Sequence, residues 1–100
     1  MTHPTLLLLV RFRTSLSEAE IMETARARAD EFRALQGLIQ KYYVFEPATG
    51  DYGGFYLWQS AEALEAYKQS ELRASIAAAY QVEGEPRLDV LQVMMPLRET

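Results

Sequence analysis

Hydrophobic and polar positions divide the chain into segments that alternate between strand and helix periodicity. Residues 5–13 begin with a Leu-rich run and then alternate apolar and charged side chains, which predicts a strand that is buried at one end and emerges toward solvent at the other. Residues 38–45 and 55–58 are dense in aromatic and β-branched side chains, which favours two further strands. Residues 88–97 predict the last strand, which should stop at Pro96.

Two helices are predicted between these strands. Ser17 is followed three residues later by Glu20, the spacing of a capping box, and the helix that begins there should run to about residue 35, before Gly37. Ser60 should cap a second helix, which continues or breaks near Ser70.

Glycine and proline mark the connections. Residues 46–54 contain one proline and three glycines, which predicts a hairpin loop between the second and third strands and makes these strands antiparallel neighbours. We expect Gly53 and Gly54 to form a bend or bulge that starts the third strand, because their spacing matches no nucleotide-binding fingerprint. Gly84 and Pro86 are expected to end the second helix.

The predicted order over residues 1–100 is strand, helix, strand, strand, helix, strand, with no internal repeat and no linker. This β-α-β-β-α-β series is typical of a single α+β domain of the ferredoxin-like type. In that fold a four-stranded antiparallel sheet carries both helices on one face.

The predicted strands are apolar on both faces, although helices on one side can cover only one of them. In the first strand, for example, Leu8 and Phe12 lie on one face, whereas Leu7 and Leu9 lie on the other. An uncovered second face would exceed the few hundred square ångströms that soluble monomers tolerate. The same face of a second copy is the simplest cover, because a two-fold axis makes one patch self-complementary. We therefore expect a homodimer, and a different protein acting as a lid is the alternative.

Composition excludes several kinds of site. The chain has no cysteine, which removes disulfides and thiolate metal sites, and His3 is its single histidine, too few for a histidine metal cluster. The net charge of -4 argues against a nucleic-acid partner. The longest apolar run, residues 6–10, is too short to cross a membrane and is followed by Arg11 rather than a cleavage site, so we expect a cytoplasmic protein.

Tyrosine density and one lysine are the candidates for chemistry. The chain has six tyrosines and one tryptophan, Trp58, and most of these side chains are expected to pack in the core or an interface. Lys41 lies in the middle of the second strand, on the same face as Ile39 and Tyr43 by alternation. Its stem could follow the sheet so that the amine reaches solvent, which is the interpretation we favour. The alternative is a cation aimed at a bound phenolate, enolate or carboxylate.

Five short motifs are left to consider: Gly37-Leu38-Ile39-Gln40-Lys41-Tyr42-Tyr43, Thr49-Gly50, Gly53-Gly54-Phe55-Tyr56-Leu57, Ala66-Tyr67 and Pro96-Leu97. Together they resemble the YdhR-like mono-oxygenases, a family within the wider antibiotic-biosynthesis-monooxygenase group. The similarity spans nearly the whole chain and is strongest from Gly37 to Leu57. The resemblance implies a homodimer of ferredoxin-like subunits, a dimeric α/β barrel, with a pocket between the sheet and the helices.

The resemblance also implies that molecular oxygen is inserted into a small aromatic or quinol-like substrate without metal, flavin or other cofactor. Trp58 and Tyr56 would then be walls of the pocket, and Lys41 or Tyr43 would be its polar contacts. Tyr67 completes the set of candidate substrate-binding residues, and no catalytic residue is assigned. Two alternatives stay open: a non-catalytic dimeric module that binds a small hydrophobic ligand, and an isomerase or cyclase that uses the same pocket for proton transfer.

Overall fold

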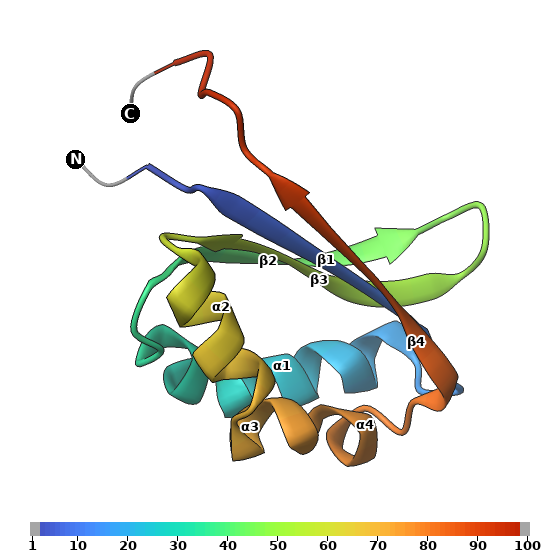
Figure 1. Cartoon of the computed structure of the whole chain (residues 1–100). Helices are drawn as coiled ribbons and strands as arrows, with labels where there is room; N and C mark the ends of the chain where they lie inside the picture. The colour runs from blue at the N-terminus through green and yellow to red at the C-terminus, as the bar shows by residue number, and fades with distance from the viewer. Residues whose placement is uncertain (1–2, 99–100) are drawn as a thin grey trace.

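The computed structural model describes residues 3–98 and contains one sheet with helices on one of its faces (Figure 1). The elements in chain order are β1 (Leu6–Arg13), α1 (Glu18–Arg33), β2 (Leu38–Glu46), β3 (Asp51–Trp58), α2 (Ala61–Lys68), α3 (Glu71–Ala74), α4 (Ile76–Ala79) and β4 (Glu83–Gln92). All neighbouring strands are antiparallel, in the order β2-β3-β1-β4. The expected α+β, ferredoxin-like arrangement is therefore confirmed.

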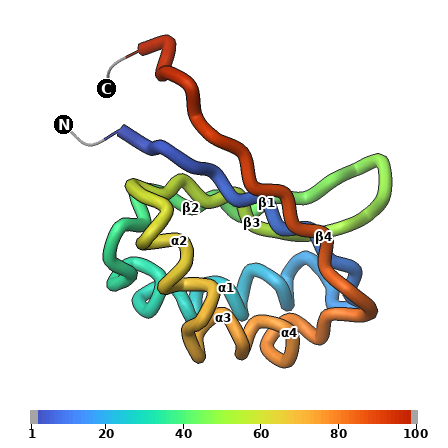
Figure 2. Tube along the Cα trace, viewed as in Figure 1, coloured from blue at the N-terminus to red at the C-terminus, as the bar shows by residue number. Residues whose placement is uncertain are grey.

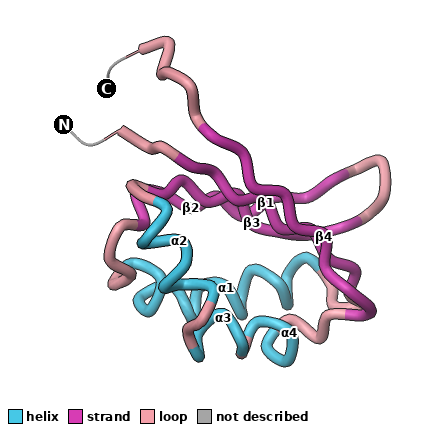
Figure 3. The backbone as a smooth tube through the Cα atoms, in the orientation of Figure 1, coloured by secondary structure: helices cyan, strands magenta, loops and turns pink. Residues whose placement is uncertain are grey.

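The molecule has two layers. The four strands form one layer, and the four helices form a second layer on one side of it (Figure 3). β1 and β4 pair directly, so the first and last described segments of the chain run side by side (Figure 2). None of the described helices combines the length and the hydropathy that a membrane span requires.

The helix boundaries follow from serine caps. The Ser17 hydroxyl accepts a hydrogen bond from the Glu20 backbone N–H, and the Glu20 carboxylate accepts one from the Ser17 N–H, so the capping box is confirmed. Ser60 caps α2 in the expected way. The second predicted helix does break near Ser70, whose hydroxyl caps the short helix α3.

Side chains from both layers form two packed clusters. The larger cluster joins the sheet to α1 and α2, and the smaller one joins β1 to α1 and the end of α4. The buried members of the larger cluster are Leu8, Phe32, Tyr56, Trp58, Leu64 and Tyr67, and those of the smaller are Phe12, Ile21 and Tyr80.

The third strand begins earlier than expected. β3 starts at Asp51, and its pairing with β1 continues without a shift through Gly53 and Gly54, so the predicted bend or bulge at this pair is wrong. A Cβ atom on Gly53 would overlap the carbonyl oxygen of Val10 in the neighbouring strand. Glycine is needed there because the two backbones approach each other closely, not because the chain turns.

The last strand is also displaced from its predicted position. β4 spans Glu83–Gln92 instead of residues 88–97, and Gly84 and Pro86 lie inside it rather than ending a helix. The pairing with β1 shifts between Arg11 and Arg13, and Gly84 there has a φ of 71°, which glycine adopts without strain. β4 is an edge strand, where a proline without an N–H is tolerated.

Candidate functional site

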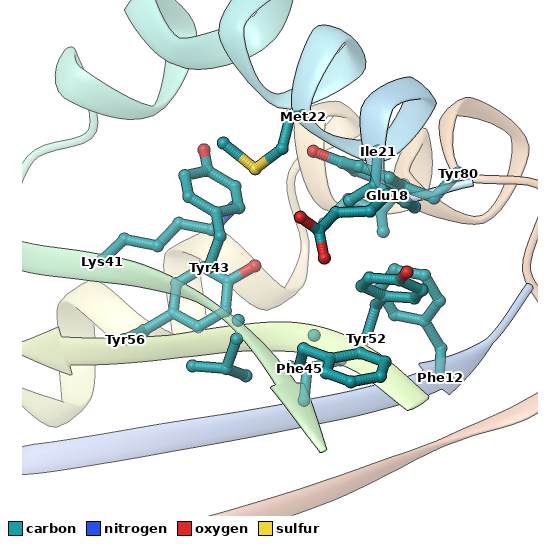
Figure 4. Close-up of a pocket in the computed structure, with 15 residues that line it drawn as sticks. Phe12, Glu18, Ile21, Met22, Lys41, Tyr43, Phe45, Tyr52, Tyr56 and Tyr80 are labelled. Atoms are coloured by element: carbon teal, nitrogen blue, oxygen red, sulfur yellow. The ribbon is translucent and has the colours of Figure 1, made fainter. Parts of the chain in front are cut away.

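A cavity of about 190 Å³ lies between the sheet and the helix layer (Figure 4). Its walls come from five elements, β1, α1, β2, β3 and α4, and from Tyr80 just after α4. Most of the lining is aromatic or aliphatic, and it includes Phe12, Glu18, Lys41, Tyr43, Tyr56 and Tyr80.

Lys41 lies on the cavity side of the sheet with Tyr43, as its alternation with that residue predicts. Ile39 falls in the register shift between Leu38 and Gln40 and pairs with no residue of β3, yet it lines a cavity of about 300 Å³ together with Lys41 and Tyr43. The position follows from register, since Lys41 is opposite the buried Tyr56.

The Lys41 amine points into a group of aromatic rings. Nζ lies 3.4 Å from the ring centroid of Phe32, 4.4 Å from that of Tyr43 and 4.7 Å from that of Tyr56. The favoured expectation that the amine reaches solvent is met only in part, because three rings surround the amine although it is not fully buried. Gly54 contributes to this placement, because a Cβ atom there would lie only 3.2 Å from the Lys41 Cε.

Two effects shift the pKa of Lys41. Burial disfavours the charged amine and the nearby Arg28 guanidinium repels it, and together they lower the pKa of Lys41 from 10.5 to about 7. No acidic side chain in the described part of the chain pairs with Lys41. The amine is therefore able to exchange a proton near neutral pH.

Tyrosine hydroxyls supply the other polar groups around the cavity. The hydroxyls of Tyr56 and Tyr67 lie 3.2 Å apart and share a hydrogen bond. Burial, followed by the effect of Tyr67, raises the pKa of Tyr56 well above its usual range, and burial also raises the pKa of Tyr43. These phenols consequently stay protonated at neutral pH and can donate hydrogen bonds.

The five sequence-predicted binding residues are only partly brought together. Lys41, Tyr43 and Tyr56 line the 190 Å³ cavity. Trp58 is fully buried behind it and stacks on Tyr56, with ring centroids 6.2 Å apart and an interplanar angle of 6°. Tyr67 bonds to Tyr56 from behind and lines a separate cavity of about 230 Å³.

Two lining residues were not singled out by the sequence. Figure 4 shows the carboxylate of Glu18 directed into the cavity from the first turn of α1. Tyr80 packs on Phe12 at 5.6 Å between centroids, and its buried hydroxyl has no hydrogen-bond partner in the described structure. Burial raises the pKa of Tyr80 to about 12. The only advance signal for Tyr80 was the general density of tyrosine.

Within residues 3–98, no group of three or more acidic or histidine side chains is arranged to hold a metal ion. The polar groups of the cavity are an amine, phenols and one carboxylate. This set is suited to hydrogen bonding and proton transfer rather than to metal ligation.

A family model described as "Putative mono-oxygenase ydhR" matches residues 7–85. The chain belongs to the ydhR family. Among curated proteins, no sequence matches this member of the family.

Solved structures share the fold at low sequence identity. NE2512 from Nitrosomonas europaea, a protein of unknown function, is 14% identical with a TM-score of 0.76, covering 100% of this chain and 99% of its own. A putative antibiotic biosynthesis monooxygenase from Caulobacter crescentus is 15% identical with a TM-score of 0.74, covering 94% and 93%. SnoaB from Streptomyces nogalater, a cofactor-independent oxygenase, is 15% identical with a TM-score of 0.73, covering 96% and 99%.

Proposed function

We propose that this member of the ydhR family is a cofactor-independent monooxygenase that oxidises a small aromatic or quinol-like molecule in the 190 Å³ cavity. The observation that carries the proposal is the amine of Lys41, which has no acidic partner among residues 3–98 and lies on the aromatic wall of that cavity. Membership of a mono-oxygenase family and a similar fold in an oxygenase support it.

The size of the cavity limits the substrate. An apolar cavity of about 150 Å³ can hold benzene. A volume of about 190 Å³ therefore suits one ring or a compact pair of fused rings. The faces of Tyr43 and Tyr56 would stack on such a ring, and the Glu18 carboxylate would accept a hydrogen bond from a ring hydroxyl.

The first chemical step is the ionisation of the substrate. A neutral Lys41 amine accepts the proton of the substrate hydroxyl and becomes an ammonium beside the resulting phenolate. The ammonium then stabilises the anion in a site with little water, where such an interaction is stronger than in solution. Because the pKa of Lys41 is lowered to about 7, its neutral form is available near neutral pH.

The substrate anion supplies the electrons that reduce oxygen. For a phenol with hydrogen on the carbon opposite the hydroxyl, the anion transfers an electron to O₂ and the two radicals combine at that carbon. The hydroperoxide then loses water to give a quinone. One oxygen atom of O₂ becomes the new carbonyl, and the other leaves as water with the ring hydrogen and the hydroxyl hydrogen.

Oxygen uptake with a panel of one- and two-ring phenols and quinols tests the proposal, with autoxidation measured in buffer alone. We expect turnover that rises as the pH passes about 7, as Lys41 loses its proton. Lys41→Met should lower kcat/KM by about 100-fold or more, the scale of general base catalysis. Lys68→Met is the matched control, since Lys68 lies on α2 in an exposed pair with Glu65 and should leave turnover unchanged.

The outcomes separate the alternatives. Binding of the panel without oxygen uptake would favour a ligand-binding module. Conversion to a product of the same composition, without oxygen uptake, would favour an isomerase or cyclase. Equal turnover by Lys41→Met and wild type would show that Lys41 is not the base that ionises the substrate.

We also propose that the protein works as a homodimer joined through the sheet face that the helices leave uncovered. The centre of this face carries Leu7 and Leu9 of β1 with Phe55 and Leu57 of β3, as their register requires. Leu91 of β4 is 54% exposed on the same face. A second copy would bury these side chains, and interfaces of this kind commonly cover about 800 Å² per partner.

A further inference from the structure

The chain contains only two lysines, and their surroundings differ sharply. Lys68 is on an exposed helix face, with its amine 3.6 Å from a Glu65 carboxylate oxygen. Lys41 has three ring faces around its amine and no acidic partner in the described chain. A lysine placed among apolar groups and near another cation is the arrangement that activates an amine as a nucleophile.

Lys41 also has room beside it for a second molecule. Together with Tyr43, it lines both the 190 Å³ cavity and a neighbouring cavity of about 300 Å³, and no other residue that the structure describes lines both. Its amine has no hydrogen-bond partner in the described structure, yet it is not fully buried, so it remains accessible from these spaces. Gly54 leaves space for the stem without filling the cavity.

The protonation state agrees with this geometry. At pH 7 an ordinary lysine amine is neutral in fewer than about one molecule in a thousand. Burial, with the Arg28 charge, lowers the pKa of Lys41 to about 7, so a large fraction is neutral. The charged and titratable groups that share its cavities or lie nearby are Glu18, Arg28, Arg33, Tyr43, Tyr52, Tyr56 and Tyr80.

We propose that Lys41 forms an imine with an aromatic aldehyde or ketone of one or two rings that enters the cavity. The amine nitrogen attacks the carbonyl carbon and forms a C–N bond. The carbonyl oxygen then leaves as water with the two hydrogens of the amine, and a C=N double bond remains. A phenol such as Tyr43 can donate a hydrogen bond to the departing oxygen. The inference rests on the proposed binding of a small aromatic molecule, but not on oxygen chemistry.

Reductive trapping tests the inference within a single protein. The wild type is treated at pH 7 with benzaldehyde and cyanoborohydride, which converts an imine into a stable benzylamine, and the modified positions are mapped by mass spectrometry of peptides. In the folded protein we expect Lys41 to be labelled at least about 10-fold faster than Lys68, given its larger neutral fraction. In concentrated urea the two lysines should be labelled at similar rates. Equal labelling of the two lysines in the folded protein would overturn the inference. This experiment uses only the wild type, so its result does not depend on whether a variant folds.

Two comparisons sharpen the result. Lys41→Arg should abolish the cavity adduct, whereas Lys68→Arg should leave it unchanged. If the aromatic walls select the carbonyl compound, the ratio of Lys41 labelling to Lys68 labelling should be higher with benzaldehyde than with propanal. Equal ratios would contradict a preference for aromatic carbonyl compounds. Trapping at Lys41 without oxygen uptake would overturn the monooxygenase proposal alone, and uptake without trapping would overturn the imine alone.

Discussion

The buried amine of Lys41 makes folding stability depend on pH. Its pKa is about 7 in the folded protein and near the ordinary 10.5 in an unfolded chain. Between these values the unfolded chain holds a proton that the folded protein lacks, so the free energy of unfolding rises with pH. Below pH 7 both states are protonated, and the full cost of burying the charge is present.

Lys41→Met should therefore stabilise the protein most in mild acid. We expect its free energy of unfolding at pH 6 to exceed that of the wild type by about 2 kcal/mol, because the cost of burying the charged amine, which lowers its pKa to about 7, is only partly offset by the contacts between amine and rings. The difference should shrink by pH 9.5. Urea unfolding at pH 6 and pH 9.5 measures this stability difference, with Lys68→Met as the control. An equal difference at the two pH values would contradict a buried, titrating Lys41 amine.

The orphaned hydroxyl of Tyr80 leads to a second stability prediction. It is buried without a partner, whereas the hydroxyl of Tyr56 bonds to that of Tyr67. Removing a buried polar group that has no partner should stabilise the fold, whereas removing one partner of a buried hydrogen-bonded pair should destabilise it. We expect Tyr80→Phe to raise and Tyr56→Phe to lower the free energy of unfolding by about 1 kcal/mol each. Thermal unfolding of the two variants checks this, and a loss of stability in Tyr80→Phe would show that its hydroxyl has a partner.

At the scale of the element, strands and helices were predictable in kind but not always in extent. The Ser17–Glu20 capping box is local chemistry, so α1 began where the sequence placed it. The strand ends at Asp51 and Gln92 depend on which backbone lies alongside, and a single strand's sequence does not contain that information. Gly53 resembled a turn residue because a close approach between strands and a turn both require glycine.

The glycines of the β2–β3 hairpin separate these two requirements. Gly53→Ala should destabilise the protein by about 3 kcal/mol or prevent folding, because the new Cβ meets the backbone of Val10, which cannot yield without breaking the pairing of β1 with β3. Gly50 has a φ of 80° in the turn and open space around it, so Gly50→Ala should cost only about 1 kcal/mol. Denaturant unfolding compares the two, and equal effects would mean that β1 moves to accept the methyl group.

At the scale of the whole molecule, the order of elements and the two apolar sheet faces were readable from the sequence, and the family resemblance implied a pocket between the sheet and the helices. The surroundings of Lys41 within that pocket were not readable. Lys41 looked like a surface residue in a strand, since alternation gives its face and not what covers that face. Helix α1 covers it, and Phe32 from that helix supplies the ring on which the amine rests. The sequence did not indicate the position of Glu18 for the same reason, because its place over the cavity depends on how α1 crosses the sheet.

The uncovered face carries the last prediction. Leu91 is exposed at the edge of that face in the single chain, so Leu91→Glu should fold normally yet place a charge inside the proposed interface. Burying an unpaired carboxylate costs several kcal/mol, which exceeds what a dimer of ordinary size can lose without dissociating at micromolar concentration. Analytical ultracentrifugation should find a dimer for the wild type and a monomer for Leu91→Glu. Ala19→Glu, on the exposed start of α1, should remain dimeric. A wild type that sediments as a stable monomer would contradict the dimer, because its apolar outer face would then be in contact with water.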